Sequence, residues 1–334
     1  MNILGLSAFY HESACCLVCD GQLVAAAAEE RFTRIKHDAR LPVEAFRFCL
    51  EAGGVDIGEL DAVAYYELPT RKLARQLWSG SFTAARDLGW LDPGVPERAI
   101  RERLGFEGRI RCYPHHLSHA ASSFFFSGFE EAAIFTADGV GEWATTTYGH
   151  ARGGEIELFE EVLFPHSLGL LYSTITAYLG FRVNGGEYKV MGLAPYGEPR
   201  FLDQVCQLVG MGAGGQFLLN MKYFDFVRGA RMYSPELARL LGFAPRAPES
   251  AITRDHKDLA RSLQLLLEEI LLEKIQYLHR RTGSKNLCMA GGVALNCVAN
   301  GRIRREGPFE QVFVQPAAGD AGRCAGRGDA RAPG

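Results

Sequence analysis

Three short apolar runs separated by polar turns open the chain. They are NILGLSA (residues 2–8), SACCLVCD (13–20) and QLVAAAAEE (22–30), and an Asp20-Gly21 hairpin signal separates the last two. Apolar runs of this length between turn residues predict a three-stranded antiparallel meander.

The same pattern returns about 130 residues later. AAIFTAD (132–138) and EWATTTYGHA (142–151) are followed by a Gly153-Gly154 turn and EIELFEEVLF (155–164). A unit repeated at this distance indicates two duplicated lobes.

Helical and strand patterns alternate after each meander, which predicts parallel strands joined by crossover helices. In the first half they are a helix at 42–54 and strands at 62–68 and 108–114; in the second half they are helices at 255–283 and 296–306 and strands at 286–292 and 311–316. This order predicts an α/β protein with the actin-like ATPase fold shared by sugar kinases, actin and certain chaperones. We expect two duplicated ribonuclease-H-like lobes, at residues 1–128 and 129–322, with a cleft between them.

Composition narrows the class of protein. The 334 residues are 47% hydrophobic and 22% charged, with a net charge of -3, which offers no electrostatic footprint for nucleic acid or an anionic membrane as partner.

The nine cysteines are an odd number and lie mostly in apolar runs. For the C-x-x-C of Cys16 and Cys19, a structural role is favoured over a redox or metal role. Because no basic leader and no 18-residue apolar stretch occurs, the sequence predicts a cytoplasmic protein.

Polar residues follow the predicted strands at their carboxyl ends, where ligands collect in open α/β sheets. His11 follows the first strand, the pair His115 and His119 follows the last strand of the first lobe, and Asp138 and Asp320 follow two strands of the second lobe. With a helix beginning near residue 117, the two imidazoles and one or two carboxylates suit iron, zinc or manganese better than magnesium or calcium. The alternative is that the histidines only cap and solvate a helix N-terminus.

Two glycine-rich tracts are candidate ligand-binding segments. MAGGVALNCVANGR (289–302) places Gly291, Gly292 and Asn296 where backbone N–H groups can hold a phosphate, although short glycine turns are also common without a ligand. FRVNGGEYKVMGLAPYGEP (181–199) is interpreted as a substrate-facing loop, with an ordinary surface loop as the alternative.

Seven segments together resemble the carbamoyltransferase family that includes nodulation and antibiotic O-carbamoyltransferases, over residues 1 to about 322. They are GLSAFYHESAC, EERFTRIKHD, HHLSHAASSFFFSGF, TADGVGEWATTT, NGGEYKVMGLAPYG, MAGGVALNCVANG and VQPAAGDAG. The resemblance extends to the tRNA threonylcarbamoyl synthase, which is related to the family's N-terminal domain and has the actin-like fold.

The resemblance implies a two-step reaction. Carbamoyl phosphate and ATP give carbamoyl-adenylate in a C-terminal adenylate-forming domain, and the actin-like domain transfers the carbamoyl group to a hydroxyl of a small-molecule natural product or oligosaccharide. Carried over by motif position, His115, His119, Asp138 and Asp320 would hold a metal ion, Fe(II) being favoured.

The same resemblance assigns the remaining roles. His11 would accept the hydroxyl proton, because an imidazole titrates near neutral pH, and Lys36 would neutralise adenylate charge or position the acceptor. Gly291, Gly292, Asn296 and Gly319 would line the nucleotide. His11 as a structural turn residue and Lys36 as a solvated charge remain alternatives.

Three rival functions are open to the sequence. A tRNA threonylcarbamoyl synthase is disfavoured by the net charge and by EYKVMGLAPYG and EERFTRIKHD, and a sugar kinase by the histidines of the cleft. An inactive truncated fragment is the third.

The third rival rests on RCAGRGDARAPG (323–334), which has no apolar period. Because the family continues here as Gly-Ala-Leu-Gly-Ala-Ala, we expect an out-of-frame tail and no adenylate-forming domain.

Overall fold

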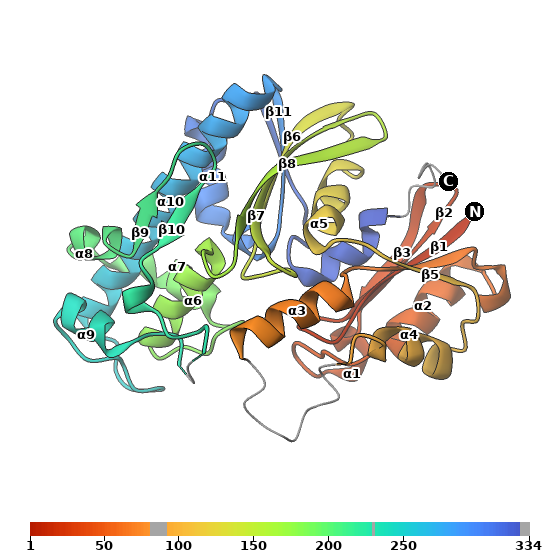
Figure 1. Cartoon of the computed structure of the whole chain (residues 1–334), viewed down its shortest axis with the longest axis horizontal. Coiled ribbons are helices and arrows are strands. Elements are labelled where there is room, and N and C mark those ends of the chain that lie inside the picture. Colours follow the sequence, from red (N-terminus) through yellow and green to blue (C-terminus); the bar gives the residue numbers. More distant parts are fainter. Residues whose placement is uncertain (81–91, 229–230, 328–334) are drawn as a thin grey trace.

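The computed structural model describes residues 1–80, 92–228 and 231–327, which form two five-stranded sheets (Figure 1). The strands of the first sheet are β1 (Asn2–Ser7), β2 (Ala14–Cys19), β3 (Gln22–Ala28), β4 (Ala62–Tyr65) and β5 (Arg109–Cys112). Those of the second are β6 (Glu131–Ala137), β7 (Ala144–Arg152), β8 (Glu155–Leu163), β11 (Asn286–Ala290) and β12 (Gln311–Val314). A separate two-stranded sheet pairs β9 (Val209–Met211) with β10 (Phe217–Leu219).

Both sheets have the same topology. The strand order is β3-β2-β1-β4-β5 in the first sheet and β8-β7-β6-β11-β12 in the second. In each, the first three strands pair antiparallel and the last two extend the sheet in parallel beside the first strand. The predicted duplicated meanders and the actin-like arrangement of two sheet lobes are therefore confirmed.

Helices connect and cover the sheets. In the first half they are α1 (Glu30–Thr33), α2 (Val43–Gly53), α3 (Pro69–Ser79), α4 (Val95–Ala99), which passes into a π-helical segment at Ile100–Leu104, and α5 (His115–Phe124). In the second half they are α6 (Leu168–Tyr178), α7 (Glu187–Leu193), α8 (Leu202–Cys206), α9 (Pro235–Leu241), α10 (Arg254–Thr282) and α11 (Cys297–Glu306). Short 3₁₀ segments lie at Ile57–Glu59, Ala194–Tyr196, Met221–Tyr223, Gly292–Leu295 (η6) and Asp320–Arg327 (η7). Among these described helices, none combines the length and apolar character of a membrane span.

The second lobe is built around the central strand β6, which is buried on both faces. Ala133 and Phe135 belong to the large core that includes side chains of α6 and α10. Ala132 and Ile134 point the other way and share a smaller cluster with α5. A strand covered on both faces requires the near-continuous apolar run seen at this position.

The long helix α10 has end signals that explain its length. Thr253 and His256 form a reciprocal capping interaction at its start, and Gly283, with φ of 64°, ends it in the left-handed region. This helix was predicted to within one residue at each end.

The first sheet is covered by α2 on one face and by η7 on the other. Gly5 of β1 permits the close approach of η7, because a Cβ atom there would lie 1.6 Å from the carbonyl oxygen of Cys324. Cys324 is buried in a cluster with Ala14, Cys16 and Val18. Residues 323–327 thus continue η7, while 328–334 lie outside the described residues, and the reading-frame hypothesis stays a prediction.

Two local expectations are corrected. The helix expected near residue 117 begins at His115, because Pro114 directly before it has an extended backbone and the N–H of Ser118 already bonds to its carbonyl. The tract 181–199, interpreted as a loop, contains α7, whose start is fixed by Glu187 accepting the N–H groups of Asn184, Gly185 and Gly186.

Candidate metal centre

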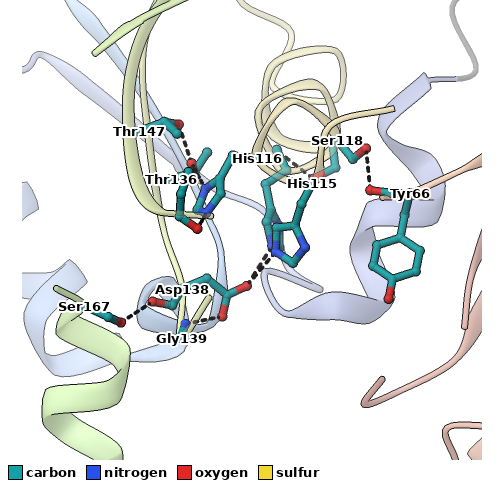
Figure 2. Close-up of polar contacts among 12 residues, drawn as sticks. Tyr66, His115, His116, Ser118, Thr136, Asp138, Gly139, Thr147 and Ser167 are labelled. Atoms are coloured by element: carbon teal, nitrogen blue, oxygen red, sulfur yellow. Dashed lines mark hydrogen bonds and ion pairs between the residues drawn. The ribbon is translucent and has the colours of Figure 1, made fainter. Parts of the chain in front are cut away.

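His115 and His119 lie one turn apart on α5, and both side chains reach Asp138, the residue directly after β6. Figure 2 shows His115 pointing toward Asp138. The Nε2 atom of His115 lies 3.2 Å from Oδ2 of Asp138, and that of His119 lies 3.0 Å from the same oxygen. Both imidazoles are buried, at 1% and 0% exposure. The spacing i, i+4 on a helix therefore places two ring nitrogens around one point, as the sequence predicted.

Asp320, at the start of η7, completes this group. His115, His119, Asp138 and Asp320 each offer one ligand atom, and these four atoms lie within 4.8 Å of one another. The four residues come from α5, from the residue directly after β6 and from η7, and η7 also packs on the first sheet. We call this group the four-residue centre.

Asp138 is held in place by its own neighbourhood. Its Oδ1 accepts the N–H of Gly139 at 2.7 Å, and its carbonyl accepts the hydroxyl of Ser167 at 2.9 Å. Burial by itself would raise the pKa of Asp138, but the hydrogen bonds and charges of His115 and His119 outweigh it and hold that pKa well below its usual range. The centre therefore presents an ionised carboxylate between two imidazoles.

The neighbouring His116 has a different role. Its Nδ1 lies 2.6 Å from the hydroxyl of Thr136, which in turn lies 2.6 Å from that of Thr147, and its Nε2 lies 2.9 Å from the carbonyl of Ala144 (Figure 2). Nδ1 thus contacts β6, and Nε2 contacts the first residue of β7. His116 ties α5 to the second sheet and is not part of the centre.

Glu142 is a buried acid that the sequence analysis did not single out. Its carboxylate accepts the N–H of His115 at 3.0 and 3.2 Å and the N–H of Leu68 at 2.7 Å. Burial raises the pKa of Glu142, and the hydrogen bonds from Leu68 and His115 oppose that rise. The side chain joins the first residue of α5 to Leu68, the residue directly before α3.

A second acid, Glu12, lies beside the centre and was also missed. Its Oε2 would be 3.4 Å from a Cβ atom on Gly319, and its Oε1 lies 3.1 Å from Nδ1 of His37. Burial and then the charge of Asp320 raise the pKa of Glu12. The sequence did offer one signal for Glu12, because it directly follows His11, the predicted base.

The predicted nucleotide-lining residues surround the same end of the sheet. Gly291 has φ of 96°, and a Cβ atom there would lie 2.2 Å from the carbonyl oxygen of Ala137. A Cβ atom on Gly292 would lie 3.0 Å from Oδ1 of Asp138, and Gly319 is buried next to Asp320. These glycines therefore adjoin the four-residue centre.

Asn296 is placed differently from the glycines. Its Oδ1 accepts the N–H of Ala299 at 3.0 Å and the amide of Gln264 at 3.1 Å, and its Nδ2 donates to Gln264 at 2.9 Å. These bonds occupy the amide oxygen and one of the two N–H groups. The local function of Asn296 is to cap α11 and join it to α10.

The two predicted catalytic residues lie on loops of the first lobe. His11 follows β1 as predicted, is partly exposed, and its ring centroid lies 3.8 Å from that of Tyr10. Lys36 is exposed, and its Nζ lies 5.6 Å from the ring centroid of Tyr188 on α7. The loop of Lys36 therefore approaches the second lobe, although Lys36 is not among the four residues of the centre.

The comparisons with known proteins agree with the resemblance seen in the sequence. A family model described as "Carbamoyltransferase N-terminus" matches residues 2–79 and 98–328. Uncharacterized protein sll1178 of Synechocystis is 46% identical, over 97% of this chain and 56% of its own length. Nodulation protein NolNO of Sinorhizobium fredii is 39% identical, over 95% of this chain and 45% of its own length.

The chain thus spans about half the length of these curated relatives. Among solved structures, HypF of T. kodakarensis aligns with a TM-score of 0.49 and 14% identity, over 97% of this chain and 47% of that one. Because the family model covers most of the chain and a relative is nearly half identical across it, the chain belongs to the carbamoyltransferase family, through that family's N-terminal region.

Proposed function

We propose that this chain is the transfer module of an O-carbamoyltransferase, moving a carbamoyl group from carbamoyl-adenylate to a hydroxyl of a small-molecule acceptor. The observation that carries the proposal is the four-residue centre, which lies at the strand ends in a member of the carbamoyltransferase family. Carbamoyl phosphate and ATP are the proposed sources of the adenylate, made by an adenylate-forming domain.

The donor set of the centre fits a divalent transition metal. Two neutral imidazoles and two carboxylates suit iron, zinc or manganese, whereas magnesium and calcium prefer oxygen ligands alone. His115, His119, Asp138 and Asp320 would hold the ion, with Fe(II) as the proposed metal. When bound, such an ion supplies positive charge for the adenylate phosphate and polarises the group that is transferred.

The residues of the chain have the following proposed parts in transfer. Gly291, Gly292 and Gly319 let the nucleotide approach the backbone beside the centre, and Asn296 shapes the same turn. The acceptor oxygen attacks the carbamoyl carbon, and the bond from that carbon to the phosphate oxygen breaks. AMP leaves with the electron pair of that bond, and His11 takes the hydroxyl proton. Lys36 neutralises charge on the adenylate.

The test combines metal analysis with a transfer assay. Protein purified without oxygen is analysed for metals, then given synthetic carbamoyl-adenylate and a panel of hydroxyl compounds, with carbamoylated products detected by mass spectrometry. The variants are His115→Ala with His119→Ala and, as a matched control, His150→Ala, whose ring instead lies 2.9 Å from Glu131.

We expect about one transition-metal ion per chain in the wild type and in the control, and loss of both metal and transfer in the double variant. Equal metal content in the double variant and the wild type would contradict the site. A metal-loaded wild type that carbamoylates no member of the panel would contradict the transfer function.

A further inference from the structure

One face of α3 carries Lys72, Arg75 and Trp78, spaced three residues apart. At 1.5 Å of rise per residue this face extends about 9 Å along the helix axis. Lys72 contacts Tyr10 of the first lobe and Trp78 contacts Trp143 of the second, so this face reaches both lobes. Figure 1 shows the course of α3. None of these side chains has a part in the proposed transfer chemistry.

The C-terminal end of this face meets two aromatic rings from the second lobe. The ring centroid of Trp78 lies 5.7 Å from that of Trp143 and 6.1 Å from that of Phe164. Trp78 nevertheless remains 49% exposed, and Trp143 is partly exposed. We call Trp78, Trp143 and Phe164 the aromatic platform.

The platform is joined by short contacts to the residues around the four-residue centre. Trp143 directly follows Glu142, whose carboxylate accepts the N–H of His115. Arg75 donates from Nε to the carbonyl of Glu142 at 2.7 Å, and its guanidinium lies 5.5 Å from the ring centroid of Phe164. The aromatic surface therefore begins one residue from a group that fixes a proposed metal ligand.

The other end of the same face leads to the proposed base. The Nζ of Lys72 lies 5.3 Å from the ring centroid of Tyr10, and that ring lies 3.8 Å from His11. A molecule resting on the platform and extending along α3 would thus have one end beside His11. This is the placement that a hydroxyl acceptor requires.

The two cations of this face already have polar partners within the protein. Lys72 forms a 2.8 Å ion pair with the buried Glu67, and the partly buried Arg75 donates to the carbonyl of Glu142 at 2.7 Å. Because both cations are held by these internal partners, the face suits an uncharged molecule. Exposed tryptophan rings offer an apolar face with a polar edge, which matches the C–H face and hydroxyl rim of a sugar ring.

We propose that the aromatic platform is the acceptor subsite and binds a ring of a neutral carbohydrate. The inference rests on the proposed transfer function for the meaning of "acceptor", but the binding itself needs neither metal nor carbamoyl-adenylate. It assigns Trp78 and Trp143 as the residues on which the sugar ring stacks.

The test is direct binding to a printed array of neutral and charged oligosaccharides, followed by titration calorimetry with the strongest neutral ligand. The variants are Trp78→Leu, Trp143→Leu and the milder Trp78→Phe. Leu77→Ala is the matched control, because Leu77 is 52% exposed on the same helix. Thermal melting and metal content verify that each variant is folded.

We expect the wild type and Leu77→Ala to bind at least one neutral oligosaccharide, and each tryptophan-to-leucine variant to lose about tenfold or more in affinity. Trp78→Phe should lie between them. The metal-free His115→Ala, His119→Ala double variant should keep its carbohydrate affinity, which separates this inference from the proposed function. A wild type that binds no neutral glycan, or tryptophan variants that bind as well as the wild type, would overturn it.

Discussion

The carboxylate of Glu142 accepts the backbone N–H of His115, with its two oxygens 3.0 and 3.2 Å from the nitrogen. The same carboxylate accepts the N–H of Leu68, so a single buried side chain joins the residue directly before α3 to the first residue of α5. The orientation of the His115 ring therefore depends on an acid that does not itself belong to the four-residue centre.

We predict that Glu142→Gln weakens metal binding by about 10- to 100-fold, the usual effect of removing a group that orients a ligand. The amide keeps one acceptor oxygen but turns an NH₂ group toward one of the two backbone donors. Affinity is measured by chelator competition on metal-free protein. Glu157→Gln, an exposed acid of β8, serves as control and should bind the metal like the wild type. Unchanged affinity in Glu142→Gln would refute the orienting role.

The second prediction concerns His11. Removing a general base costs about a hundredfold to ten-thousandfold in rate, so His11→Asn should slow transfer from carbamoyl-adenylate by that factor. Metal content and melting temperature should stay at wild-type values, because His11 lies outside the four-residue centre. His150→Asn is the control for a general effect of losing an imidazole. A full rate in His11→Asn would place the base elsewhere.

Much of the fold and of the four-residue centre could be predicted from short-range patterns. The two meanders and α10 have strong apolar periods and clear end signals, and their observed bounds lie close to the predicted ones. His115, His119, Asp138 and Asp320 could be grouped because parallel strands bring their carboxyl ends to one edge of a sheet.

The features that the sequence did not predict depend mostly on partners that are distant along the chain. Glu142 bonds to residues 74 and 27 positions away, and no local pattern identifies those partners. The role of Asn296 in lining the nucleotide stays a prediction, and the bonds of its amide to Gln264 on α10 are a further contact that no local pattern identifies. The helix α7 was not predicted, because its tract is rich in glycine and has no periodic apolar face. Its start is fixed instead by Glu187, which accepts the N–H groups of Gly185 and Gly186.

The third prediction tests the strand-to-helix turn. Gly291→Ala places a Cβ atom about 2 Å from the Ala137 carbonyl, on a residue whose φ of 96° disfavours any side chain. We expect a loss of about 1–3 kcal/mol or more in the free energy of unfolding, together with a displaced Asp138 and weaker metal binding. Gly192→Ala, in α7 with open space around its Cβ position, should be neutral or stabilising by about 0.5–1 kcal/mol. Equal stabilities in urea for the two variants would contradict this account.

The last prediction concerns Asp38, which organises the loop that carries Lys36. Its carboxylate accepts hydrogen bonds from the Arg40 guanidinium at 2.6 Å and from the Thr33 hydroxyl at 2.9 Å, and its carbonyl accepts the Ser13 hydroxyl at 2.8 Å. The hydrogen bonds from Arg40 lower the pKa of Asp38 to about 2, against an opposing effect of burial. A carboxyl whose pKa is lowered by folding stabilises the protein above its ordinary pKa, and this stabilisation disappears as the pH falls toward the folded value.

The difference in unfolding free energy between the wild type and Asp38→Asn should therefore be constant above about pH 5. It should narrow by roughly 1 kcal/mol at about pH 3 and by about 2 kcal/mol near pH 2, since each unit of pKa shift is worth about 1.4 kcal/mol. Urea unfolding of both proteins across this range measures the difference. Repeating it in an Arg40→Gln background should remove most of the pH dependence, because the guanidinium is the largest cause of the shift. A difference that is the same at about pH 6 and pH 3 would show that the Asp38 carboxylate does not stabilise this loop through its charge.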